Sequence, residues 1–217
     1  MKKTLILSLL LFRTLTSYGQ YPTGVSPFFK SWPRLKFEVL TMPILSQNFV
    51  GGGMSFLFPV KPRFSMGMSI TGLQKQIDNK FNYSMGQPIL TSTELGLVGQ
   101  YNVIENEKFT VGFSLTAGYA NVNLADNDDK VGFRTRYGYG YNPRTITNND
   151  YFLLSPGFEA AYKVLSSQKW PNLYLALSVK DRYLFGKTNF GVKDNFSNHS
   201  ISLGITMTRS ANPRRRF

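Results

Sequence analysis

The chain contains few residues that can perform covalent catalysis. Its 217 residues include one histidine, His199, and no cysteine, which excludes thiol chemistry and cysteine-ligated metal sites. A hydroxyl nucleophile needs a histidine beside it and a carboxylate that orients the histidine. Ser200 and Ser202 fall on the opposite face of the alternating stretch that holds His199, so only Asp181 and Ser197 are available. We therefore predict a protein that is not an enzyme and has no cofactor.

A second candidate for chemistry is the acidic stretch "ADNDDK". Its carboxylates, Asp126, Asp128 and Asp129, are the oxygen ligands that Ca²⁺ prefers. The stretch lacks the ligand spacing, the turn glycine and the distal glutamate of an EF-hand loop. We interpret it as the polar tip of a loop and predict no metal site.

A third candidate is the stretch "RTRYGYGYNPR", residues 134–144, in which arginines are interleaved with tyrosines. Such a composition can stack on flat rings and neutralise anionic groups. The sequence predicts an interaction loop with these candidate residues: Arg134, Arg136, Tyr137, Tyr139, Tyr141 and Arg144.

The elements that position these residues are predicted to be strands. The stretch "FSLTAGYA", residues 113–120, alternates bulky apolar residues with small or polar ones, and a period of two is typical of a strand with two different faces. The same alternation predicts eight strands, at residues 34–43, 49–59, 63–76, 89–103, 108–121, 151–164, 172–185 and 198–209.

The links between the predicted strands differ in length. The second, fourth and sixth strands are followed by short turns, whereas the third, fifth and seventh are followed by long polar links. The longest of these, from about Asn121 to Asp150, is predicted as a loop, and the short "ILSQN" after the first strand is an exception. Short turns at one rim and long loops at the other predict an up-and-down barrel with both termini at the rim of short turns.

The kind of polar residue distinguishes a membrane barrel from a soluble barrel of lipocalin type. A water-facing surface normally carries many Lys and Glu, yet the polar faces of the third, fifth and eighth strands are almost entirely Ser, Thr and Gly. Small residues suit a narrow interior, so we expect Phe113, Leu115 and Tyr119 to face lipid. The predicted fold class is all-β, an eight-stranded antiparallel up-and-down transmembrane β-barrel.

Several charged residues share the inward parity of this barrel. An eight-stranded barrel has room inside for side chains and little else, and buried charges must find opposite partners. We therefore predict an ion-pair network that fills the lumen and leaves no open pore. Its predicted members are Glu38, Glu94, Glu159, Lys163, Lys180 and Arg182, and Lys36 shares their inward parity.

The N-terminus predicts export. Residues 1–19 combine a basic start, a short apolar run and small residues at Ser17 and Gly19, as a signal peptide does. We expect residues 20–33 to form an N-terminal arm, 34–209 the barrel and 210–217 a basic tail. The chain has 25 Lys plus Arg against 12 Asp plus Glu, which favours contact with anionic surfaces.

The ending "SYGQYP" of the leader, the eight alternating strands, the long loops at one rim and the C-terminal Phe217 resemble the small outer-membrane barrels of the OmpA/OmpX-like type, particularly those of Bacteroidetes. The resemblance covers about Arg34 to Arg209. It implies a location in the outer membrane of a Gram-negative cell, with both termini in the periplasm. Lipid A deacylases of this kind place a serine two residues from the histidine, but here that position is Ile201.

We expect a non-enzymatic accessory subunit of a larger outer-membrane complex for secretion, uptake or barrel assembly. The alternative is a free-standing structural or adhesive surface protein acting through its loops, and a remote alternative is an enzyme that modifies lipid A. The expected partners are outer-membrane lipid, lipopolysaccharide and other outer-membrane proteins, and not nucleic acid. Arg214, Arg215 and Arg216 are candidates for periplasmic docking.

Overall fold

The structure is a computed structural model that describes residues 33–78, 83–106, 108–135, 138–166, 171–187 and 196–208. The predicted signal peptide, the arm up to residue 32 and the basic tail lie outside these residues. The strands are β1 (Arg34–Ile44), β2 (Gln47–Lys61), β3 (Phe64–Gln76), β4 (Pro88–Glu105), β5 (Phe109–Thr135), β6 (Gly138–Leu165), β7 (Asn172–Phe185) and β8 (Asn198–Thr208). The described residues include no helix long and apolar enough to cross a membrane.

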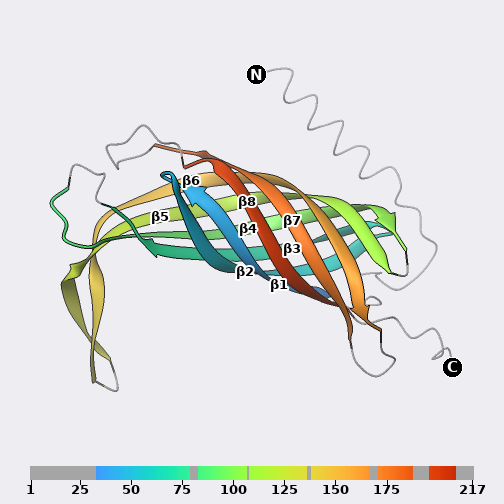
Figure 1. Cartoon of the computed structure of the whole chain (residues 1–217), viewed down its shortest axis with the longest axis horizontal. Coiled ribbons are helices and arrows are strands. Elements are labelled where there is room, and N and C mark those ends of the chain that lie inside the picture. The colour runs from blue at the N-terminus through green and yellow to red at the C-terminus, as the bar shows by residue number, and fades with distance from the viewer. Residues whose placement is uncertain are drawn as a thin grey trace.

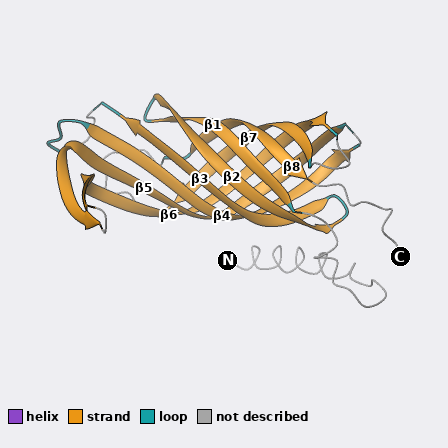
Figure 2. Ribbon diagram, turned by 90° about the horizontal axis from the view of Figure 1, so that it is seen from below, coloured by secondary structure: helices purple, strands orange, loops and turns teal. Residues whose placement is uncertain are grey.

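The eight strands form one closed barrel (Figure 1). Each strand pairs antiparallel with its neighbours in sequence, and β1 closes the ring by pairing with β8 from Leu35↔Met207 to Thr41↔Ile201. Figure 2 shows the strands wrapping obliquely around the barrel axis. Closure leaves no unpaired strand edge around the wall. The predicted fold class is confirmed.

The two ends of the barrel are distinct. At one end, here called the turn end, β1 begins, β8 ends, and short connections join β2 to β3, β4 to β5 and β6 to β7. At the opposite loop end, β1 and β2 are joined by a two-residue turn in which Leu45 and Ser46 both have positive φ, 51° and 62°. This backbone is typical of the two-residue hairpin turns that match the twist of the strands.

The prediction of a loop from Asn121 to Asp150 is wrong. β5 and β6 continue to pair as far as Thr135↔Gly138, whereas β4 ends its pairing at Pro88↔Asp126 and β7 ends at Phe152↔Phe185. The two strands thus leave the barrel as a hairpin that bends away from it (Figure 1). The polar and glycine-rich composition hid these strands, because both faces of the hairpin meet solvent and the alternation of polarity is weak.

Candidate functional site

The outward face of the barrel wall carries the large apolar side chains. Phe113, Leu115 and Tyr119 are 57%, 49% and 46% exposed, whereas Thr116 between them is buried. The same arrangement holds on β8, where Ile201 and Leu203 are exposed. The predicted orientation of these faces is confirmed.

The alternation inverts partway along the strands, which the sequence analysis missed. On β1 the exposed positions change from apolar to polar towards the loop end, while the buried positions change from charged to apolar. The exposed series is Phe37, Val39, Thr41 and Pro43, and the buried series is Lys36, Glu38, Leu40, Met42 and Ile44. We call the part of the barrel between this inversion and the turn end the turn half, and the part between the inversion and the loop end the loop half.

The turn half is closed by an ion-pair cluster. Lys36 Nζ lies 2.7 Å from Glu38 Oε2 and 2.7 Å from Glu159 Oε2, and Lys180 Nζ lies 3.0 Å from Glu38 Oε1. Ser202 donates a hydrogen bond to Glu38 Oε2 at 2.8 Å, and Lys36 donates one to Ser178 Oγ at 2.7 Å. Every carboxylate of the cluster faces a cation, as buried charges require.

A second ion pair lies where the two halves meet. Arg182 pairs with Glu94 through Nη2 and Oε1, and its Nη1 donates to Asn198 Oδ1 at 2.7 Å. A cavity of about 20 Å³, lined among others by Glu38 and Leu40, separates this pair from the cluster below it. That volume holds roughly one water molecule. The predicted single network is therefore two separate groups, because Glu94 reaches Arg182 and not the lysines.

Three further charged residues lie closer to the turn end. Lys163, predicted as a network member, has no carboxylate within ion-pair distance among the described residues, and its Nζ lies 5.5 Å from the ring centroid of Tyr174. Arg34 and Glu105 form an ion pair at 3.2 Å that the sequence analysis missed. The irregular pairing between Asn102 and Ile104 shifts the parity of Glu105, so simple alternation does not place it inward.

The loop half of the lumen is filled by an apolar core. Its members come from strands β1 to β7 and from the segments just after β3 and just before β8. Phe49, Leu90 and Leu124 are 0% exposed. The core residues are Leu40, Met42, Ile44, Phe49, Leu73, Ile77, Leu90, Ala120, Val122, Leu124, Tyr151, Leu153, Leu184 and Phe196. The sequence contained a signal for this core. Leu40, Met42 and Ile44 have the same strand parity as Lys36 and Glu38, and therefore also point into the lumen.

The acidic stretch lies in β5 and not at a loop tip. Asp126 accepts backbone hydrogen bonds from Gly86, Gln87 and Asp128, each at 3.1 Å, and Asp129 pairs with Arg144 at 2.9 Å. The backbone N–H groups, that of Gln87 above all, lower the pKa of the Asp126 carboxyl. The stretch therefore clamps the segment before β4 to β5. No group of carboxylates or histidines in the described part of the chain is arranged to hold a metal ion.

The predicted interaction residues are divided between the hairpin and undescribed positions. Tyr139 and Tyr141 are 76% and 68% exposed on the hairpin, and the register pairs them with Arg134 and Gly132, which puts Arg134 on the same face. Arg144 is held by Asp129. Arg136, Tyr137 and the tail residues Arg214, Arg215 and Arg216 lie outside the described residues.

The hairpin is stabilised by contacts between aromatic rings and glycines. A Cβ added at Gly140 would lie 2.4 Å from Cζ of Phe133, so the Phe133 ring covers this glycine on one face of the hairpin. On the other face, Tyr141 lies over Gly132, with Cε1 at 3.4 Å from the corresponding position. A ring that covers a cross-strand glycine shields the backbone and pins the register.

The residues considered for hydroxyl chemistry do not form a nucleophilic site. His199 Nδ1 lies 3.8 Å from Asp181 Oδ1 on the outside of the barrel, and both side chains are more than half exposed, at 75% and 57%. Ser197 Oγ instead accepts a hydrogen bond from the backbone N–H of Leu184 at 3.1 Å.

No protein-family model and no curated protein matches this sequence. Among solved structures, the chain is similar to Neisserial surface protein A (NspA), with 9% identity, a TM-score of 0.51, and coverage of 82% of this chain and 96% of that chain. It is also similar to the outer membrane protein OprG from Pseudomonas aeruginosa, with 10% identity, a TM-score of 0.47, and coverage of 83% of this chain and 97% of that chain. At such identities the likeness concerns the fold. The chain therefore has the fold of the small eight-stranded outer-membrane barrels that its sequence resembles.

Proposed function

We propose that the chain is an integral barrel of the bacterial outer membrane that has no enzymatic activity. The apolar outer surface of the turn half supports this proposal, because Val39 and Leu97, at 62% and 63% exposed, would otherwise lie bare in water. Exposed aromatic residues flank that surface, with Tyr101 and Tyr162 towards the turn end and Tyr119 and Phe152 towards the loop end. Such girdles are typical of barrels at the membrane interfaces.

In this proposal the loop end faces the outside of the cell and both chain termini lie in the periplasm. The projecting β5–β6 hairpin favours this orientation, since outer-membrane barrels have short periplasmic turns and longer extracellular loops. We infer that the membrane boundary lies near Val39 on β1 and Leu95 on β4, because beyond these residues the exposed positions Thr41 and Thr93 are polar. The loop half then stands in water, which accounts for its apolar core.

The proposed activity is binding, as an accessory subunit that docks on a larger outer-membrane protein through the hairpin. The observation that carries it is the pairing of β5 with β6 beyond both neighbouring strands, so that within the described residues no strand pairs with either outer edge of the hairpin. An unpaired edge is a template for a strand of another protein. The filled lumen supports a role in binding rather than conduction.

A second candidate partner is an anionic surface ligand such as glycan or lipopolysaccharide. One face of the hairpin carries Lys130, Arg134, Tyr139 and Tyr141, all of which are exposed. Cationic and aromatic side chains together suit a ring-containing polyanion. This candidate corresponds to the free-standing adhesive protein, and the two partners call for different variants of the hairpin.

The test replaces residues 131–142 by an Asn-Gly turn, which retains the Asp126 clamp and the core residue Leu124. Purification in mild detergent, followed by mass spectrometry of the proteins that co-purify, should show loss of a partner that the parent protein retains. A second variant, R134Q with Y139S, should preserve strand-edge docking but abolish binding of anionic glycan, because it leaves Phe133 and Tyr141 over their glycines. N142S, on the opposite face of the hairpin, is the matched control. Retention of every partner by the turn replacement would contradict the proposed role of the hairpin.

A further inference from the structure

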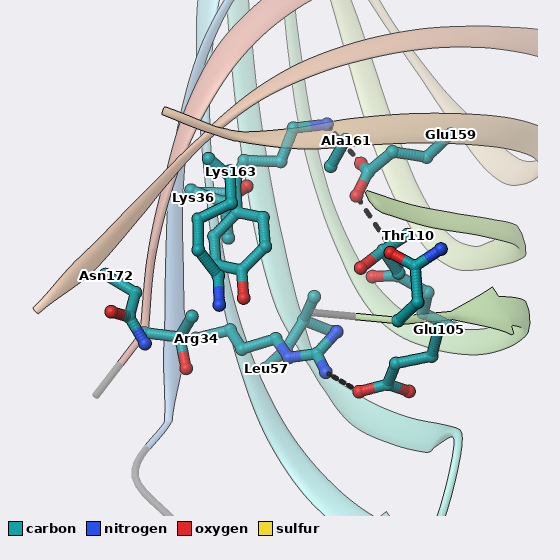
Figure 3. Close-up of a pocket in the computed structure, with 14 residues that line it drawn as sticks. Arg34, Lys36, Leu57, Glu105, Thr110, Glu159, Ala161, Lys163 and Asn172 are labelled. Atoms are coloured by element: carbon teal, nitrogen blue, oxygen red, sulfur yellow. Dashed lines mark hydrogen bonds and ion pairs between the residues drawn. The ribbon is translucent and has the colours of Figure 1, made fainter. Parts of the chain in front are cut away.

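The turn end contains a pocket that the proposed function does not use. It has a volume of about 240 Å³ and lies inside the barrel wall, below the ion-pair cluster (Figure 3). Its lining comes from strands on opposite sides of the barrel, with Arg34 from β1, Glu105 from β4, and Asn172 from β7. Pockets for drug-sized ligands begin at about 300 Å³, so this one suits a smaller molecule.

The pocket is lined by one more cationic side chain than carboxylates. Two carboxylates line it, and both are paired, Glu105 with Arg34 at 3.2 Å and Glu159 with Lys36 at 2.7 Å. The third cation, Lys163, has no carboxylate partner among the described residues and lies on the other side of the pocket from Glu105 (Figure 3). An ammonium group in a confined polar space attracts one negative charge.

The pocket also contains a buried hydroxyl that has no partner among the described residues. Thr206 is 8% exposed and lines the pocket, and no described residue forms a hydrogen bond with its Oγ1. A buried polar atom without a partner costs free energy, which a ligand recovers once the almost fully covered Thr206 hydroxyl turns into the pocket and bonds to it. The amide side chain of Asn172 and the hydroxyl of Thr110 line the same space. These groups suit a ligand that carries hydroxyls beside its charge.

We propose that this pocket binds a small molecule with one carboxylate or phosphate next to hydroxyl groups, as a uronic acid or a hexose phosphate has. The anion pairs with Lys163, and a hydroxyl of the ligand bonds to Thr206 Oγ1. The ring of Tyr174 and the side chains of Leu57 and Ala161 provide the apolar part of the wall. This site is independent of the hairpin, so a failure of this proposal does not affect the proposed function, and the reverse also holds.

The test is a nuclear magnetic resonance titration of the full mature protein in detergent micelles. D-Glucuronate and glucose 6-phosphate are the probes, and glucose is the neutral control. The K163Q variant should bind both probes about tenfold to a hundredfold more weakly, as loss of a charge-assisted hydrogen bond implies. The T206V variant should bind about twofold to tenfold more weakly with its unfolding midpoint unchanged, because the hydroxyl it removes has no partner among the described residues.

Lys108→Gln is the matched control, since Lys108 lies at the same rim but does not line this pocket. Competition with short-chain phosphatidylglycerol, whose head group has the same combination of phosphate and hydroxyls, distinguishes two sources of the ligand. If phosphatidylglycerol displaces glucuronate, the natural ligand is a lipid head group. If phosphatidylglycerol does not displace it, the natural ligand is a soluble molecule. The proposal is overturned if glucose binds as well as glucuronate, if K163Q binds as well as the parent, or if the pocket resonances do not move with either probe.

Discussion

The two halves of the lumen are closed by opposite kinds of interaction. In the turn half, Lys36, Glu38, Glu159 and Lys180 neutralise one another, whereas the loop half is packed with apolar side chains such as Phe49 and Leu153. The outer surface changes in the opposite sense at the same level. A wall that faces lipid leaves its polar residues to the interior, whereas a wall that faces water can bury an apolar core. On the proposed placement in the membrane, this difference reflects lipid around the turn half and water around the loop half.

The largest effect is expected from breaking the charge cluster. The substitution Glu38→Gln leaves Lys180 without its carboxylate partner and Lys36 with Glu159 alone. It should lower the free energy of unfolding by about 3–5 kcal/mol, as loss of one member of a buried ion pair does. Guanidinium unfolding of the protein in lipid vesicles measures this value.

The matched control for the cluster is Glu105→Gln. Its pair with Arg34 is partly exposed, with side-chain exposures of 37% and 22%, so its loss should cost no more than about 1 kcal/mol. Equal effects of the two substitutions would show that burial does not distinguish the cluster from the rim.

Leu153→Ala tests the apolar core of the loop half. Leu153 is 1% exposed, and truncating such a residue costs about 2–5 kcal/mol because it loses apolar contact and leaves a cavity. The same vesicle unfolding experiment measures the loss. Unlike the effect of Glu38→Gln, this loss should hardly change with ionic strength, and a strong salt dependence would argue against an apolar core.

The proposed membrane boundary is tested by two arginine substitutions on β4. Leu97 lies on the outer surface of the turn half and Thr93 on that of the loop half. Leu97→Arg should destabilise the barrel by about 2–4 kcal/mol and Thr93→Arg by at most about 1 kcal/mol, as depth in the bilayer dictates. Equal costs at the two positions would place both on the same side of the boundary.

The smallest effect is expected at the Asp126 clamp, which lies above that boundary. The backbone N–H groups of Gln87, Asp128 and Gly86 lower the pKa of Asp126, so the carboxylate stabilises the fold above the ordinary pKa of an aspartate. This contribution is lost as the pH falls through the lowered pKa of the folded state. Amide hydrogen exchange at Gly86 and Gln87 should then accelerate at acid pH relative to the core strands. D126N should show fast exchange at every pH, and protection in D126N equal to that of the parent would exclude the clamp.

Much of the barrel wall follows from local pattern in the sequence. Alternation with a period of two is a property of neighbouring residues, so the strands and the faces of Phe113 and Thr116 can be assigned before any pairing is known. The eight strands lie within a few residues of their predicted positions, apart from the extended ends of β5 and β6. There the composition of a solvated hairpin resembles that of a loop, and only the observed register separates the two.

The interior depends on contacts between residues far apart in the chain. Parity predicted that Lys36, Glu38 and Arg182 point inward, but which charges meet is decided by barrel closure and strand register, which bring Ser202 to Glu38 across 164 positions. The separation of Arg182 and Glu94 from the lysines, the isolation of Lys163 beside Tyr174 and the pocket below them follow from that register. The sequence by itself determined the inward parity of the regularly paired lumen residues, because side-chain direction in a strand is local, but not that of Glu105, whose parity depends on the irregular pairing of β4 with β5. Only the tertiary structure decided their partners, because the distance between two strands at a given level is set by the closed ring.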